Sequence, residues 1–196
     1  MAAHTAAAPH ADYHSKLGNN RLGLWLFILS DSFVFIGLFV TRFYLLGGHR
    51  PELNQILGLI VTSVLLISSF FMNRAEVSIA HGDRKGFLNS TLITMLLGLT
   101  FLVGVVGVEW PLAGQHFGPD TGPEGAVFFM MTGMHAFHVL TGVLFLSIVY
   151  RNGRKGLYSA ERHWAVEACT NYWHFVDVVW IFFYPALYLI GTVAAG

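Results

Sequence analysis

The chain has 196 residues, of which 55% are hydrophobic, 15% aromatic and only 11% charged, and its formal net charge is zero. Soluble domains usually carry about 25% charged residues, so a bilayer must act as the solvent for much of this apolar surface. A neutral chain offers no electrostatic basis for binding nucleic acid. Cys169 is the single cysteine, which excludes an internal disulfide and argues against a cysteine-based metal cluster.

Residues 1–20 are polar and rich in alanine and histidine, and they lack the apolar core of a secretory signal peptide. We interpret them as a polar N-terminal tail that precedes a transmembrane domain covering residues 21–196. His4, His10 and His14 in this tail could bind a metal ion, but their irregular spacing favours an incidental occurrence.

Five segments are apolar over the roughly 20 residues that a helix needs to cross a bilayer. The predicted helices cover approximately residues 22–46, 53–72, 87–108, 126–150 and 169–193. The fold class is therefore all-α: a polytopic membrane protein with a bundle of five transmembrane helices. No internal repeat is visible, which argues against a transporter built from duplicated halves.

Basic residues are unevenly distributed between the two sets of loops. If the N-terminus is inside, nine of them lie on the inner side, against Arg42 and Arg50 on the outer side. The inner residues are Lys16, Arg21, Arg74, Arg84, Lys85, Arg151, Arg154, Lys155 and Arg162. The positive-inside rule therefore predicts an N-terminus inside and a C-terminus outside.

The first predicted helix contains a carboxyl, Asp31, about 14 Å from its inner end at 1.5 Å per residue. An ionisable group is costly in hydrocarbon, so it should face other protein or a cavity. No basic residue lies near it in the sequence. Two interpretations stay open: a proton-exchanging or lipid-contacting site, or a carboxyl that is hydrogen-bonded to a neighbouring helix or subunit.

Polar residues also gather on the last two predicted helices. His135 and His138 are three residues apart and share a helix face. A polar stripe on the last helix is expected to point inward, and it comprises Glu167, Asn171, His174, Asp177, Tyr184 and Tyr188. Because His138 and Asp177 lie at similar depth, an interhelical His–Asp or His–Glu bond would satisfy both groups. Haem or metal ligation and proton handling are the alternatives, although the Glu-x-x-His motif of di-iron bundles is absent.

Several segments together resemble subunit III of the haem–copper respiratory oxidases. The run YWHFVDVVWIF (172–182), which follows Glu167, resembles the last helix of that family, and FFMMTGMHAFHVLTG (128–142) resembles its penultimate helix. The connection GDRKG (82–86) and the pair Glu109-Trp110 also resemble family features. The resemblance covers roughly residues 23–191.

The resemblance implies a cytochrome c oxidase subunit III with no catalytic residue, metal ligand or redox centre of its own. Haem and copper would reside in partner subunits. The chain would pack against subunit I, near subunit II and a possible small subunit IV, in a bacterial inner membrane. It would bind phospholipid and support proton uptake and sustained turnover, with cytochrome c as electron donor to the complex. It starts at the equivalent of the third helix of seven-helix members, as shorter bacterial members do.

The resemblance also implies roles for individual residues. Arg151 matches a family position that meets lipid headgroups, and Arg154 and Lys155 stand beside it. Asp31 stands where the family commonly has a glutamate associated with carbodiimide reactivity and proton uptake. The expected interhelical polar network comprises Glu109, His135, His138, Glu167, His174 and Asp177.

Three other functions remain open at this point. Subunit III of a quinol oxidase is the nearest, because the choice of donor lies in subunit II. An accessory protein of a nitric oxide reductase is the next. A small independent transporter is the most distant.

Overall fold

A computed structural model describes residues 9–193, with side chains from residue 16 onward. The long helices are α1 (Pro9–Leu46), α2 (Gln55–Ala80), α3 (Arg84–Leu102), α5 (Pro123–Arg154) and α6 (Trp164–Tyr184). The π-helical turns η1 (Val103–Glu109) and η2 (Pro185–Leu189) continue α3 and α6, and η1 leads into the short α4 (Trp110–Ala113). The strands β1 (His49–Arg50) and β2 (Thr192–Val193) pair in parallel.

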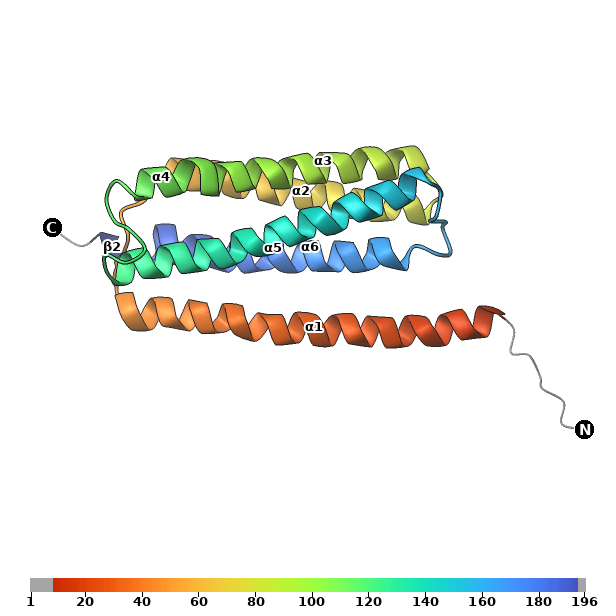
Figure 1. Cartoon of the computed structure of the whole chain (residues 1–196), viewed down its shortest axis with the longest axis horizontal. Coiled ribbons are helices and arrows are strands. Elements are labelled where there is room, and N and C mark those ends of the chain that lie inside the picture. Colours follow the sequence, from red (N-terminus) through yellow and green to blue (C-terminus); the bar gives the residue numbers. More distant parts are fainter. Residues whose placement is uncertain (1–8, 194–196) are drawn as a thin grey trace, which may run out of the picture.

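The helices lie side by side in an up-and-down bundle (Figure 1). Helices α2 and α3 run along one side, α5 and α6 cross the middle, and α1 lies along the opposite edge. Within the described residues, four stretches are long and apolar enough to cross a membrane: Lys16–Leu46, Gln55–Ala80, Arg84–Ala113 and Pro123–Arg154. Helix α6 is not among the four, because its polar stripe lowers its hydropathy, yet with η2 it runs beside them over a comparable length. The prediction of an all-α membrane bundle is confirmed.

Several helices extend beyond the apolar runs that predicted them. Helix α1 begins at Pro9, so residues 9–20 are helical and continuous with the first apolar run. The division into a polar tail and a transmembrane domain stays a prediction. Helix α2 continues to Ala80, because a helix does not end where the hydrocarbon does. His4 lies outside the described residues, as do the side chains of His10 and His14, so the structure is silent on metal binding there.

The two ends of the bundle differ in charge. The end where α2 turns into α3 and α5 turns into α6 carries a group of cations, and we call it the basic end. These cations are Arg84, Lys85, Arg151, Arg154 and Lys155. Asp83 caps α3 there, since its side chain accepts a hydrogen bond from the backbone N–H of Gly86. That the basic end faces the inside of the cell stays a prediction.

Helix α6 packs tightly against its neighbours through large aromatic side chains. Trp173 is fully buried, and a Cβ added at Gly98 of α3 would lie 2.5 Å from its ring atom Cη2. A Cβ added at Gly142 of α5 would lie 2.9 Å from its Cε3. The indole N–H of Trp173 donates to Ser68 of α2 at 3.0 Å. Glycine at both positions therefore lets α3 and α5 approach the indole closely.

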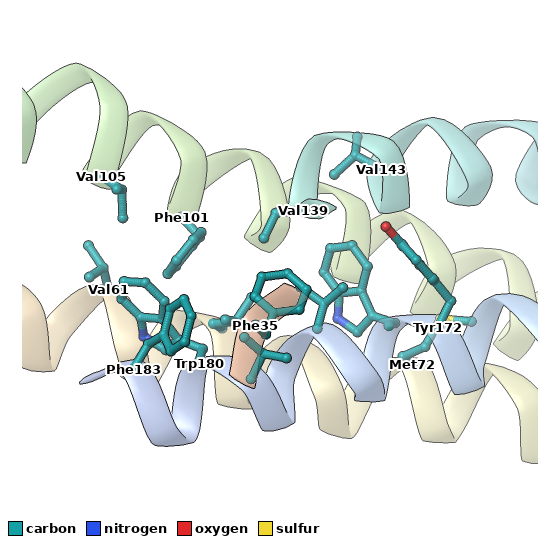
Figure 2. Close-up of a cluster of buried hydrophobic side chains, with 14 of the residues drawn as sticks. Phe35, Val61, Met72, Phe101, Val105, Val139, Val143, Tyr172, Trp180 and Phe183 are labelled. Carbon is teal, nitrogen blue, oxygen red and sulfur yellow. The ribbon is translucent and has the colours of Figure 1, made fainter. Parts of the chain in front are cut away.

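A second aromatic group lies further along α6 (Figure 2). Trp180 stands edge-on to Phe101 of α3, with ring centroids 4.9 Å apart, and its N–H donates to Thr62 of α2 at 2.9 Å. Phe35 of α1 reaches the same group and contacts Phe183 with ring centroids 5.7 Å apart. The core thus centres on α6, and α1 contributes few side chains to it.

Candidate functional site

The polar side chains singled out from the sequence do not form one network; they occupy separate positions along the bundle. Near its middle, Oδ2 of Asp31 on α1 lies 3.0 Å from Nε2 of His138 on α5. Both side chains are largely buried, with exposed fractions of 16% and 10%. The sequence predicts Asp177 at the same depth as His138, but the structure brings Asp31 to the histidine.

The contact is an ion-pair distance and not a formed hydrogen bond. Nδ1 of His138 lies 2.7 Å from the carbonyl oxygen of Met134, which can only accept, so Nδ1 carries a hydrogen. Nε2 is the ring nitrogen that faces the carboxyl, and Oδ2 of Asp31 makes no hydrogen bond within the described residues. The histidine therefore ties α5 to its own backbone and brings its second nitrogen close to the carboxyl of α1.

Closer to the basic end, Arg21 of α1 pairs with Glu167 of α6. Its Nε lies 3.0 Å from Oε1, and its second nitrogen Nη2 lies 3.0 Å from Oε2. Such a two-pronged contact is the strongest geometry open to an arginine and a carboxylate. Glu167 is therefore held at the α1–α6 contact and does not join the histidines of α5.

At the opposite end, the guanidinium of Arg42 is fully buried and is held by backbone carbonyls. It donates to Ala186 at 2.7 Å, to Ile190 at 2.7 Å, to His49 at 2.9 Å and to Gly47 at 3.0 Å. These acceptors come from the end of α1, β1 and the chain after α6. Loop charge alone does not predict this role for Arg42; the sequence signal for it is an arginine inside an apolar helix.

His135 lies in an aromatic enclosure. Its side chain is fully buried, and neither ring nitrogen has a hydrogen-bond partner within the described chain. The rings of Trp180 and Phe101 stand at centroid distances of 4.7 and 5.5 Å. His135 and His138 share a helix face, as predicted, but they have different surroundings and do not meet a common partner.

Glu109 occurs where the two π-helical turns meet. It is the last residue of η1 and accepts a short hydrogen bond from the hydroxyl of Tyr188 in η2. Its other oxygen, Oε2, has no partner among the described residues. Glu109 also lines a pocket of about 260 Å³ that includes Glu52 and His116. π-Helical turns are rare and often occur at functional positions, which makes this pair notable.

The stripe on α6 does not point wholly inward, contrary to expectation. Asp177 and Tyr188 are buried, whereas Asn171 is half-buried and the side chain of His174 is 37% exposed. Nδ1 of His174 lies 2.7 Å from the hydroxyl of Ser69 on α2 and 3.8 Å from Oδ2 of Asp177. The exposed part of the stripe lies between α1 and α2.

The expected headgroup residues lie together at the end of α5. Arg151, Arg154 and Lys155 are all exposed at the basic end. Arg84, which the sequence did not single out, donates to the carbonyls of Gly153 and Arg154 and so caps α5. That capping leaves the other three cations directed at solvent or membrane surface.

In the part of the chain that the structure describes, no three His, Cys, Asp or Glu side chains gather closely enough to hold a metal ion. The arrangement instead consists of separate polar contacts that tie helices together.

Comparison with known proteins identifies the family. The family model for cytochrome c oxidase subunit III matches residues 5–192. This chain belongs to the cytochrome c oxidase subunit III family. It is 35% identical to cytochrome c oxidase subunit 3 of Thermostichus vulcanus over 191 residues, which are 94% of this chain and 92% of that protein. It is 36% identical to the protein of the same name from Salmo salar over 187 residues, 88% of this chain and 70% of that protein. The Gadus morhua protein gives 35% identity with the same coverage.

Membership of the subunit III family confirms the resemblance and places the chain in an oxidase complex of the respiratory membrane. A member of this family is a multi-pass membrane subunit, which agrees with the apolar helices. The family match includes Asp31, His138 and the α6 stripe, since all lie within residues 5–192.

Proposed function

We propose that this chain is subunit III of a proton-pumping haem–copper oxidase that takes electrons from cytochrome c and reduces dioxygen to water. It carries no redox centre; haem and copper reside in partner subunits, and it stabilises subunit I in the inner membrane of a bacterium. Subunits I and II, with a possible small subunit IV, complete the complex. The observation that carries this proposal is the subunit III family match over nearly the whole chain.

The Asp31–His138 pair supports a part in proton uptake. It lies near the middle of the bundle, and both side chains are slightly exposed. A carboxyl and an imidazole at this distance can pass a proton between them. In this proposal the pair helps to keep protons arriving at the entrance of subunit I.

The end of α5 supports phospholipid binding. Arg151 follows Leu144 and Ile148 on one outward side of the helix, at spacings of seven and three residues. Both of these apolar side chains are exposed. A phospholipid can therefore lay its acyl chain along them while its phosphate meets Arg151, whose planar fork suits that group. Arg154 and Lys155 add positive charge beside it.

The test compares purified complex that contains this chain with complex prepared from cells lacking it. Oxygen consumption driven by reduced cytochrome c is followed over many turnovers. We expect similar initial rates and a faster loss of activity without the chain; equal endurance contradicts the stabilising role. An optical spectrum of the material that co-purifies with the chain should show haem, and a colourless, solitary chain contradicts the assignment to an oxidase complex.

A further inference from the structure

The membrane-facing surface of the bundle is chemically uneven. The outward side of α5 is apolar through the middle of the membrane, with Phe137, Leu140 and Leu144 exposed. On α3, the exposed Thr100 satisfies its hydroxyl by donating to the carbonyl of Leu96, one turn earlier. The hydroxyl of Thr100 therefore faces lipid tails with its hydrogen-bond donor satisfied.

Helix α6 differs, because two outward side chains keep unsatisfied hydrogen-bonding groups. Asn171 makes no side-chain hydrogen bond within the described chain. His174 uses Nδ1 on Ser69, which leaves Nε2 without a partner among the described residues on the 37% of the side chain that is exposed. With Val178 and Ile181 they follow the spacing of a single helix face, and we call these four residues the α6 face.

The position of these two polar side chains deep in the membrane makes their unsatisfied groups energetically costly. Asn171 and His174 lie about 11 and 15 Å from the start of α6 at 1.5 Å per residue, near the centre of a hydrocarbon layer of about 30 Å. Lipid tails can neither donate nor accept a hydrogen bond, so an amide and an imidazole facing them stay unsatisfied. A side chain from another transmembrane helix can supply the missing partner.

The surroundings of the α6 face have the shape that a helix requires. Helix α6 lies between α1 and α2, as Figure 1 shows. Next to the face, an apolar groove of about 370 Å³ separates α6 from α1. Its lining includes Phe35, Ile36, Phe39, Val178 and Phe182. Apolar side chains of an incoming helix can fill this groove while a polar one reaches Asn171 and His174.

We propose that the α6 face is where this chain docks on a transmembrane helix of the haem-bearing subunit, and that this helix presents a hydrogen-bonding side chain level with Asn171 and His174. The inference rests on the proposed function, because it takes the partner to be a polypeptide of the oxidase. It goes beyond that function by assigning the face, the depth and the chemistry of the contact. The apolar side of α5 is left to lipid.

Photo-crosslinking in the intact complex tests the proposal. A benzoylphenylalanine replaces Val178 on the α6 face, and as a matched control it replaces Leu144 on α5; the two side chains are 49% and 55% exposed. We expect the reagent at position 178 to form an adduct with the haem-bearing polypeptide and the reagent at 144 to form lipid adducts. Lipid adducts alone at 178, or an adduct with a second copy of this chain, overturn the proposal.

Substitution provides a second measurement that does not depend on the reagent. Asn171→Leu removes the amide without disturbing a bond inside the chain, and Thr100→Leu makes the same kind of change on α3. We expect Asn171→Leu to lower the amount of chain retained on the complex in rising detergent by about three- to tenfold, and Thr100→Leu to leave it unchanged. Equal retention of the two variants overturns the proposal.

The outcomes separate this inference from the proposed function. If the chain co-purifies with haem but the adducts with the haem-bearing polypeptide form at position 144, the assignment of the docking surface to the α6 face is wrong and the subunit assignment stands. If no haem-bearing polypeptide co-purifies with the unsubstituted chain, the proposed function itself fails.

Discussion

Nε2 of His138 and Oδ2 of Asp31 stand 3.0 Å apart where α1 meets α5. Removing one partner leaves the other buried without a counterpart, which costs far more than the pair contributes to stability. We therefore expect His138→Phe to lower the free energy of unfolding by about 3 kcal/mol. The double variant Asp31→Leu/His138→Phe should recover most of that loss. Unfolding in mixed micelles measures both, and a double variant as unstable as the single one contradicts the pairing.

His135 should behave in the opposite way. Its ring nitrogens have no hydrogen-bond partner among the described residues and its neighbours are aromatic, so His135→Phe removes an unsatisfied polar group and keeps the ring. The expected change in the free energy of unfolding lies between a small gain and a loss of about 1 kcal/mol. The same assay serves as the readout. A loss as large as that of His138→Phe would mean that His135 has a polar role the packing does not reveal.

We expect that even a conservative substitution of Arg42 destabilises the protein. Lysine keeps the charge but cannot fork onto the four carbonyl oxygens that the guanidinium reaches. Arg42→Lys should cost at least about 3 kcal/mol and speed hydrogen exchange at the amide of Thr192, which donates to Gly48. Arg50→Lys is the control, because Arg50 makes a single 3.3 Å bond to Gly191. We call Arg42 and its four carbonyl acceptors the clamp. Equal rates of hydrogen exchange at Thr192 in the two variants would contradict its role in holding β2.

Gly98 should not tolerate a methyl group. Its added Cβ would lie 2.5 Å from the buried ring of Trp173, so Gly98→Ala is expected to cost about 1–3 kcal/mol through overpacking. At Gly37 of α1, nothing lies within 4 Å of an added Cβ, and Gly37→Ala should be neutral or slightly stabilising. Thermal unfolding of both variants in detergent is sufficient, and identical midpoints would argue against the close approach of α3 and α6.

The contact of Tyr188 with Glu109 gives another double-variant test. Tyr188→Phe removes the hydroxyl that donates to Oε1 and, because Oε2 has no partner within the described chain, it leaves the whole carboxyl unsatisfied. The expected cost is about 1–3 kcal/mol. Tyr188→Phe/Glu109→Leu should be more stable than Tyr188→Phe alone, as measured by urea unfolding in micelles. An additive loss in the double variant would show that the two groups do not depend on each other.

The number and order of helices follow from the length of apolar runs, whereas their ends do not. Asn73 and the polar residues after it leave the hydrocarbon but continue α2 to Ala80, since nothing before Gly82 breaks the helix. The same holds for residues 9–20 of α1. Hydropathy marks where a helix meets water, and capping or glycine marks where it ends.

The pairing of polar groups was beyond what the sequence could specify. Depth along a helix can be counted, and it placed His138 level with Asp177. The rotation of each helix about its axis decides which of several candidates faces the histidine, and that rotation depends on packing between distant segments. His138 therefore met Asp31, and His174 met Ser69.

The clamp around Arg42 has a consequence for how the protein is made. Its acceptor Ala186 follows it by 144 residues, so at 5–20 residues per second the ribosome supplies that carbonyl about 7 to 30 s after the arginine. Until then α1 resides in the membrane with a cation that lacks two of its four acceptors, the carbonyls of Ala186 and Ile190. Docking of α1 is thus a late step in biogenesis, and a nascent chain stalled before α6 would expose that cation to quality control.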